Sequence, residues 1–505
     1  MPNYPSPGVY VEELEAGSRP IEGVGTAVAA FVGFAAEGPP HTPTLVTNWS
    51  QFTRLFGGFT EGSYLAHAVY AYFDNGGGSA YIVRMGQASA GAAVPATAEL
   101  TSGGESPLPA YRLVALEAGP RGNDVAVEVS DLDGETFKVV VRGPGREEVF
   151  EPVNASRGRR NVATVVNAQS TLIRLEELEG ALATRPAAGV VSLRGGDTGG
   201  QAPLRAQEYV GETSDRTGLA GLEVIDNVTM LCVPDVMAAY EQGLLDLEGV
   251  QAVQLAMISH CERMGDRMAI LDPPPGLGPQ QVLDWRVNLA GYDSKYAALY
   301  WPYLNVMDPV TGTVRPVPPS GHMAGIWARN DTSRGVHKAP ANEVVRGAIS
   351  PALQITKPEH DLLNPVGVNC LRTFPARGTR VWGARTLSSD AAWRYVNVRR
   401  LFNYIEGSLL AGTQWAVFEP NDPDLWGRLT RTISAFLYRV WLDGALFGTT
   451  PQEAFYVRCD AETNPSEVIE AGSVVVEIGI AAVKPAEFVV FRLAQLPTGT
   501  SAVTE

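Results

Sequence analysis

The chain has 505 residues, a formal net charge of -16 at pH 7, 45% hydrophobic residues and 19% charged residues. This length exceeds the size at which one hydrophobic core keeps growing, so we expect about two to four domains, and the composition excludes wholesale disorder. The excess of acidic residues repels polyphosphate and anionic headgroups, which disfavours nucleic acid and membrane surfaces as primary partners.

The sequence predicts neither a secretory signal nor a membrane anchor. The first residues lack a basic start followed by an apolar run, and no segment offers about 20 uninterrupted apolar residues. The cysteines have no zinc-type spacing, so we interpret them as buried, reduced thiols. They are Cys232, Cys261, Cys370 and Cys459. We therefore expect a soluble protein that is made in the cytoplasm and does not insert into a membrane.

Residues 1–20 are rich in proline and glycine and predict an extended N-terminal arm. The arm contains one run of alternating polarity that is typical of an isolated strand, made of Val9, Tyr10, Val11 and Glu12. A single strand is not stable alone, and the prolines before it exclude a place within a broad sheet. We expect this run to pair with a strand edge in a second copy of the chain.

Apolar strand, helix, strand patterns follow between residues 28 and 85 and resume between residues 222 and 303. A helix between two apolar strands is typical of a crossover unit in a sheet that is covered on both faces. The sequence therefore predicts one discontinuous α/β domain made of residues 21–86 and 208–350.

The intervening residues 87–207 differ in character, with Ala, Gly and Ser at their borders. Alternating runs such as residues 126–129 and 137–141 favour strands with one buried face. We expect an inserted, peripheral, β-rich domain here.

A final unit is expected over residues 351–487, with helices at about 390–410 and from Pro423 onward. Strand-like segments follow at residues 455–459, 473–483 and 488–493, and residues 488–505 form a closing strand and tail. The last two segments could supply the edge that the N-terminal arm needs. We therefore predict inter-subunit strand pairing at Val474, Val476, Ile478, Ile480, Phe488 and Val490.

A basic interval in this unit carries a positive net charge, opposite in sign to the net charge of the whole chain. Arg394, Arg399 and Arg400 lie in it, and Asp390 is its single acid. One interpretation is attachment to an acidic neighbouring chain. The alternative is that these arginines pair internally with acids elsewhere in the chain.

No catalytic, cofactor-binding or metal-binding residue is predicted. The glycines at residues 76–78 precede a strand and lack the lysine and hydroxyl residue of a phosphate loop. His260 and Cys261 are adjacent, so on a helix their side chains diverge by about 100° and cannot activate one another. The cluster of Glu359, His360 and Asp361 has no further metal ligand beside it.

Short segments along the whole chain resemble those of contractile tail sheath proteins, the family of phage tail sheaths and of extracellular contractile injection system sheaths. The resemblance is carried by the order of PGVYVEE at 7–13, TAVAAFVG at 26–33, GGSAYIVR at 77–84, APAN at 339–342, LNPVGVN at 363–369, WGARTL at 382–387, YVNVRRL at 395–401, FEPND at 418–422 and VKPAEF at 483–488. The insertion carries no such segment.

The resemblance implies a structural subunit and no enzyme. It implies hexameric rings that stack into a helical sheath around a tail tube, and a contraction that drives the tube through a target envelope. In this scheme residues 351–487 form an inner α+β sheath domain, the α/β domain lies in the middle, and the insertion faces outward. The N- and C-terminal arms are extended.

The implied partners are further copies of the chain, a tail tube protein, and baseplate and terminator or cap proteins, with no cofactor. The acidic neighbour of Arg394, Arg399 and Arg400 would then be the tube or another sheath subunit. Assembly would take place in the bacterial cytoplasm, and the product would be a phage tail or a phage-tail-like particle that can be released from the cell. Two alternatives stay open. One is an α/β enzyme with an unrecognised site, since strand ends in such sheets carry ligand sites. The other is a different structural subunit of the same particle.

Overall fold

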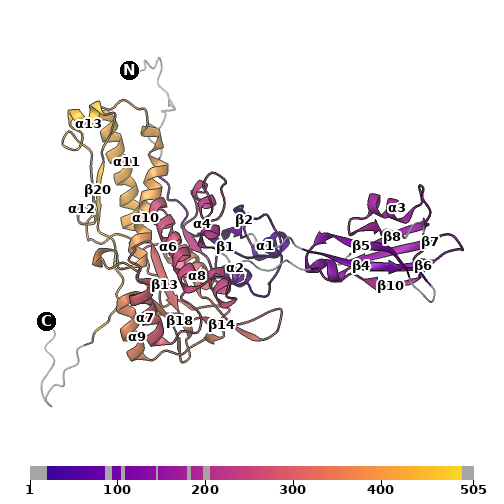
Figure 1. Cartoon of the computed structure of the whole chain (residues 1–505). Coiled ribbons are helices and arrows are strands. Elements are labelled where there is room, and N and C mark those ends of the chain that lie inside the picture. The colour runs from indigo at the N-terminus through magenta and orange to yellow at the C-terminus, as the bar shows by residue number, and fades with distance from the viewer. Residues whose placement is uncertain are drawn as a thin grey trace, which may run out of the picture. The chain divides into compact units, whose positions relative to one another are not determined.

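The computed structural model describes residues 20–85, 94–103, 108–143, 146–178, 184–196 and 205–491. The chain divides into two compact units (Figure 1). The inserted unit is Gln87–Leu204, and the main unit combines Met1–Gly86 with Arg205–Glu505. Both helices and several separate sheets are present, so the predicted multidomain fold of mixed α and β structure is confirmed.

The main unit is built on an 8-stranded sheet in the order β18-β17-β13-β12-β11-β1-β3-β2. The strands from β17 to β3 pair in parallel, and the edge strands β18 and β2 are antiparallel to their neighbours. The inner strands are short apolar runs because they are buried on both faces. The bounds are β1 Val28–Gly33, β2 Thr44–Val46, β3 Ser79–Arg84, β11 Met230–Cys232, β12 Met268–Leu271, β13 Ala297–Trp301, β17 Val368–Phe374 and β18 Gly378–Val381.

Helices cover this sheet, and one pair is held very close. A Cβ atom added to Gly321 of α8 would lie 2.4 Å from the Cα atom of Ala68 on α2, so only glycine allows this approach. The helices of this part are α1 Trp49–Phe56, α2 Leu65–Asp74, α4 Ala206–Val210, α5 Asp235–Glu241, α6 Leu247–Met264, α7 Pro279–Asp284, α8 Ser320–Arg334 and α9 Lys357–Leu363. In the described part of the chain no helix is both long and apolar enough to cross a bilayer.

The sheet continues beyond residue 350, where the sequence predicts that the α/β domain ends. Strand β17 pairs with β13, and β18 pairs with β17. The connection from β13 to β17 is long because it passes through α8, α9 and a small sheet of its own, made of β14 Leu304–Met307, β15 Val314–Val317 and β16 Ser350–Pro351. Because of this long interruption, local sequence patterns do not predict that β17 belongs to the same sheet.

Two long helices and a small sheet complete the main unit. Helix α10 (Val396–Gly412) and helix α11 (Pro423–Leu442) share a core with the small helices α12 (Pro451–Ala454) and α13 (Ser466–Glu470). Helix α11 starts as predicted, with Pro423 in its first turn and the carboxylate of Asp422 accepting from Leu425 N–H at 2.9 Å. Strands β19 (Phe455–Arg458) and β20 (Glu477–Ile480) form an antiparallel pair.

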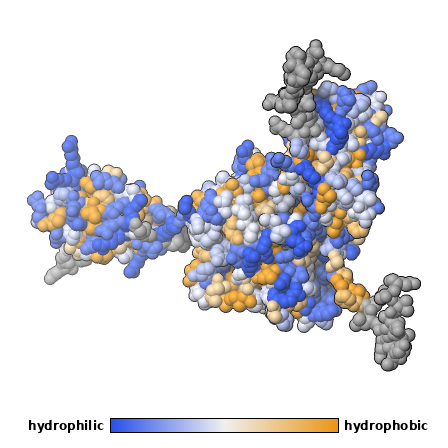
Figure 2. Space-filling model, turned by 180° about the vertical axis from the view of Figure 1, so that it is seen from behind, coloured by the Kyte–Doolittle hydropathy of each residue, from blue (hydrophilic) through white to orange (hydrophobic). Residues whose placement is uncertain are grey.

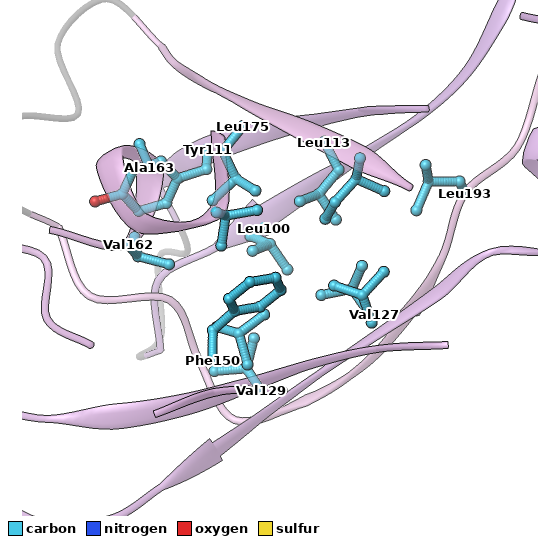
Figure 3. Packing of buried hydrophobic residues seen from close by; sticks show 14 of the residues in the cluster. Leu100, Tyr111, Leu113, Val127, Val129, Phe150, Val162, Ala163, Leu175 and Leu193 are labelled. Carbon is cyan, nitrogen blue, oxygen red and sulfur yellow. The ribbon is translucent and has the colours of Figure 1, made fainter. Parts of the chain in front are cut away.

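The inserted unit has two antiparallel sheets, in the orders β4-β5-β9 and β10-β6-β7-β8. Side chains from both sheets point toward one another and form one core, which includes Leu113, Val127 and Phe150 (Figure 3). The elements are β4 Pro95–Thr101, β5 Pro109–Ala118, β6 Ala126–Asp131, β7 Phe137–Gly143, β8 Arg146–Val153, α3 Val162–Gln169, β9 Ile173–Glu177 and β10 Gly189–Ser192.

Candidate functional site

The pair β19 and β20 lies on the helical core and has one open edge. Val474, Val476, Ile478 and Ile480 alternate along this segment and pack, partly buried, against the core that contains Leu429. One edge of β20 pairs with β19, and no other strand in the described ranges pairs with its second edge. An edge of this kind is a template for a strand from another chain.

Strand β20 is shorter than the predicted segment 473–483, because its flanks bind loop and helix-end groups. Val475 N–H donates to Asn464 Oδ1 at 2.7 Å, and the Asn464 amide donates back to the Val475 carbonyl at 3.0 Å. On the other side, Val483 N–H donates to the Ala445 carbonyl at 3.2 Å. These contacts fix the ends of β20, and an isolated bridge between Leu446 and Ala482 follows it.

The predicted strand at residues 488–493 is not a strand in its described part, residues 488–491, because no partner strand lies beside it. Its side chains are almost fully exposed: Phe488 73%, Val489 71%, Val490 78% and Phe491 82%. They contribute to the orange surface that borders the grey atoms at the lower right of Figure 2. We call residues 488–491 the apolar tail. A run of consecutive exposed apolar residues with high strand propensity indicates a segment that pairs with another surface.

A polar cluster holds the residue just before the apolar tail. Arg385 binds the Glu487 carboxylate through two bonds, from Nε to Oε1 at 2.9 Å and from Nη2 to Oε2 at 2.6 Å. Asn364 Nδ2 donates to Oε1 at 2.7 Å, and the Tyr395 hydroxyl donates to Oε2 at 3.1 Å. We call these residues the Glu487 cluster. Sequence reasoning missed it, although all of its members lie in segments that carry the family resemblance.

Burial alone would raise the pKa of Glu487, but hydrogen bonds and the charge of Arg385 hold that pKa below its ordinary value. The carboxylate is therefore ionised at neutral pH. Beside the cluster lies a groove of about 620 Å³, whose lining includes Trp382, Lys357, Phe488 and Val489.

Two of the predicted attachment arginines are internal. Arg399 is 2% exposed, donates to Asn403 Oδ1 at 2.6 Å and to Glu406 Oε1 at 2.9 Å, and lies 4.6 Å from the ring centre of Trp393. Arg400 is 4% exposed and forms two bonds to Asp331, at 2.8 and 2.6 Å.

The attachment interpretation is therefore wrong for Arg399 and Arg400 in this conformation, and the alternative of internal pairing describes them. The sequence could not decide this because Asp331, the partner of Arg400, is remote in the chain. Arg394 is exposed and stays available for contact with a neighbour.

The predicted N-terminal strand residues Val9, Tyr10, Val11 and Glu12 lie outside the described residues. The described chain that follows the arm is firmly held. Ile21 is buried in the core of α10 and α11, and Val24 N–H donates to Ser408 Oγ at 3.1 Å. The N-terminal arm therefore departs from a fixed point on the helical part of the main unit.

The place where an α/β enzyme would bind a ligand is filled by a buried carboxylate. The strand order reverses between β11 and β1, and ligands of open α/β sheets bind beyond the strand ends at such a point. Asp235 follows β11 there, accepting from Phe34 N–H at 2.5 Å and from the Ser63 hydroxyl at 2.9 Å. Burial raises the pKa of Asp235 to about 6, although these hydrogen bonds oppose the shift.

The neighbouring acid is also structural. Asp272 follows β12 and accepts from Ser320 N–H at 2.9 Å, which caps α8, and burial raises its pKa to about 7. Within the described ranges no group of three or more metal-ligating side chains is assembled. His260 and Cys261 are both buried, and His260 contacts Arg267 at 3.3 Å.

Known protein families match the second half of the chain. The model of the phage tail sheath protein central domain matches residues 233–387, and that of the phage tail sheath C-terminal domain matches residues 388–495. The two adjoining matches together span more than half of the chain. The chain is also 25% identical over 499 residues to the tail sheath protein of Burkholderia phage BcepMu, in an alignment that covers 93% of this chain and 92% of that protein.

Solved structures share the fold along almost the whole chain. The helical sheath of the anti-feeding prophage in its contracted state superimposes with a TM-score of 0.60 at 24% identity, covering 97% of this chain and 99% of that one. The contracted sheath complex of the extracellular contractile injection system PVC gives a TM-score of 0.58 at 23% identity, covering 98% and 99%. With both domain models matched in order and a relative aligned over nearly its full length, this chain belongs to the phage tail sheath family.

Proposed function

We propose that this chain is the structural subunit of a contractile tail sheath, which assembles as stacked hexameric rings around a tail tube and contracts to drive the tube through a target envelope. Family membership supports the sheath role, and it applies to nearly the whole chain. The observation that carries the assembly mechanism is the combination of an open β20 edge with an apolar tail that has no strand partner in the described chain.

In this mechanism the subunits exchange strands. The open edge of β20 accepts a strand from a neighbour, and Phe488 and Val490 of the apolar tail pair with a neighbour in turn. The N-terminal run from Val9 to Glu12 is the second donated strand. Contacts of this kind are heterologous, so they propagate into rings or helices instead of closing as a dimer.

The remaining partners follow from the same role. Arg394 is the exposed member of the basic interval and provides a contact with an acidic tube or neighbour. Baseplate and cap proteins would bind the ends of the sheath. The subunit is made and assembled in the bacterial cytoplasm and needs no chemical catalysis, since contraction is a movement of rigid bodies.

The experiment compares cylinder formation by the full chain and by two variants, using negative-stain electron microscopy. Phe488→Asp combined with Val490→Asp should abolish ordered cylinders, because burying unpaired carboxylates in a strand interface is unfavourable. The control is Leu132→Asp, which changes a side chain that is 51% exposed in the inserted unit. Normal cylinders from the tail variant would contradict strand exchange, and a wild-type chain that never forms cylinders with its tube would contradict the sheath role.

A further inference from the structure

The Glu487 cluster brings together residues from four separate stretches of the chain. Asn364 follows α9, Arg385 follows β18, Tyr395 precedes α10, and Glu487 precedes the apolar tail. Four hydrogen bonds converge on the Glu487 carboxylate, and Arg385 Nη1 also donates to the Asn364 carbonyl at 3.2 Å. A single carboxylate bound by a bidentate arginine and two further donors is among the strongest polar contacts a surface segment can make.

The arginine at the centre of the cluster is itself fixed to the sheet. Arg385 N–H donates to Asn369 Oδ1 at 2.7 Å, and the Asn369 amide donates to the Arg385 carbonyl at 2.8 Å. Asn369 is fully buried on β17 and also donates to the Leu299 carbonyl of β13 at 3.1 Å. The carboxylate of Glu487 is thereby tied to the interior strands of the 8-stranded sheet.

The chain between β20 and the apolar tail runs from the core of α10 and α11 to the 8-stranded sheet. At its start, the Val483 carbonyl accepts from Asn397 Nδ2 of α10 at 3.1 Å. At its end, Glu487 lies in the cluster, and Phe488 and Val489 line the groove beside Lys357 and His360. Figure 1 shows α9, which contains these last two groove residues, toward one end of the main unit, with β20 farther toward the other.

This path has a consequence for strand pairing. Residues 484–487 follow the bound Val483 and are long enough to form the loop of a hairpin, so that a free apolar tail could fold back antiparallel past residues 481–483 toward the open edge of its own β20. Such intramolecular pairing would occupy both the donor strand and the acceptor edge of one chain. It would also be favoured over pairing with a neighbour, because the effective concentration within one chain is high.

We propose that the Glu487 cluster prevents this self-pairing and thereby reserves both the apolar tail and the β20 edge for second copies of the chain. The proposal rests on the strand exchange described under Proposed function. Glu487 is a positioning residue in this scheme. It sets the point from which the tail departs, and its side chain takes no part in the strand ladder.

The test measures hydrogen exchange at the outward-facing amides of β20 in dilute, unassembled chain. In an antiparallel strand every second N–H points away from its paired neighbour, so these amides exchange fast while the edge is open. We expect Glu487→Gln to slow them by about tenfold or more, independently of protein concentration, because the released tail docks on its own edge. The same variant should form fewer or no cylinders.

Two further variants make the result specific. Asp361→Asn removes a carboxylate that lines the same groove and pairs with the exposed Lys357 at 2.9 Å, and it should leave exchange at β20 unchanged. Tyr395→Phe removes one bond to Glu487 and should give a smaller change in the same direction as Glu487→Gln, which keeps the proposal testable if the latter folds poorly.

Unchanged exchange at β20 in both Glu487→Gln and Tyr395→Phe would overturn the inference, even if the tail became easier to cleave with protease. Failure of the proposed function is distinguishable from this result. It would appear as an absence of cylinders from the wild-type chain, whereas self-pairing is measured in the unassembled chain and does not depend on cylinders.

Discussion

Replacing Arg400 by alanine should destabilise the main unit by about 3–5 kcal/mol, although the residue lies in an interval whose charge suggests a surface role. The reason is the environment of its guanidinium. The side chains of Arg400 and Asp331 are each 4% exposed, and two bonds of 2.8 and 2.6 Å join them. The guanidinium also donates to the Thr26 carbonyl at 2.9 Å and lies 4.8 Å from the ring centre of Trp327.

The magnitude follows from what the substitution leaves behind. Removing Arg400 leaves the Asp331 carboxylate buried without its counter-charge, and breaking one partner of a buried ion pair costs about 3–5 kcal/mol. The Thr26 hydroxyl, which donates to Asp331 Oδ2 at 2.6 Å, compensates only part of this charge. Replacing both partners by apolar residues, as in Arg400→Met with Asp331→Leu, should recover most of the loss because no charge is then left unpaired.

Tryptophan fluorescence during urea unfolding is a suitable assay, because all 9 tryptophans of the chain lie outside the inserted unit. The fluorescence transition therefore reports on the main unit alone. The matched control is Arg394→Ala, which removes an exposed arginine from the same interval and should change the free energy of unfolding by about 0.5 kcal/mol or less. A loss of less than about 1 kcal/mol for Arg400→Ala would refute the argument from burial.

Two other predictions concern the tail and the insertion. The pKa of Glu487 is lowered in the folded chain, so the stabilisation from its cluster is fully present above its ordinary pKa and is lost only as pH falls through the lower, folded value. Burial and the charge of Arg372 lower the pKa of the neighbouring His360, so its ring gains a proton at a lower pH than an ordinary histidine does. Hydrogen exchange at the outward-facing amides of β20, corrected for the intrinsic effect of pH, should therefore stay fast at about pH 5 and become slower in stronger acid, where the released tail docks on the edge, whereas Glu487→Gln should give slow exchange at both pH values. Replacing Gln87–Leu204 by a short Gly/Ser linker should leave the unfolding free energy of the main unit within about 0.5 kcal/mol of the wild type, because the inserted unit has its own core, and a large loss of stability would mean that the two units fold as one.

The strands and helices of the fold could be predicted well where the local pattern is continuous. Helix α11 is indicated by Asp422, Pro423 and an apolar face, and the inner strands by short apolar runs. The pairing of β17 with β13 could not be predicted in this way, because a long connection separates the two strands. Local patterns identify an element, but they carry no information about which remote element it pairs with.

In the candidate site, too, the sequence predicts local patterns but not the contacts between remote segments. Alternation along Val474, Val476, Ile478 and Ile480 correctly indicates one buried face. The apolar residues from Phe488 onward suggest a strand, yet strand geometry needs a partner that the described part of the single chain does not supply. The Glu487 cluster leaves no local signal, because Asn364, Arg385 and Tyr395 become neighbours of Glu487 only through the tertiary fold.

The internal arginines also explain how the main unit can move as one body. Arg400 of α10 binds Asp331 of α8 and the carbonyl of Thr26, just before β1, so it ties the helical part to the sheet. Asn397 of α10 adds a bond to the His337 carbonyl at 2.7 Å. The mechanism that we propose requires rigid bodies joined by arms that depart from fixed points. Ile21 provides such a point for the N-terminal arm, and Glu487 provides one for the apolar tail. We therefore expect the basic interval to support contraction from within, by making the subunit rigid, and under the proposed function contact with a neighbour would fall to Arg394.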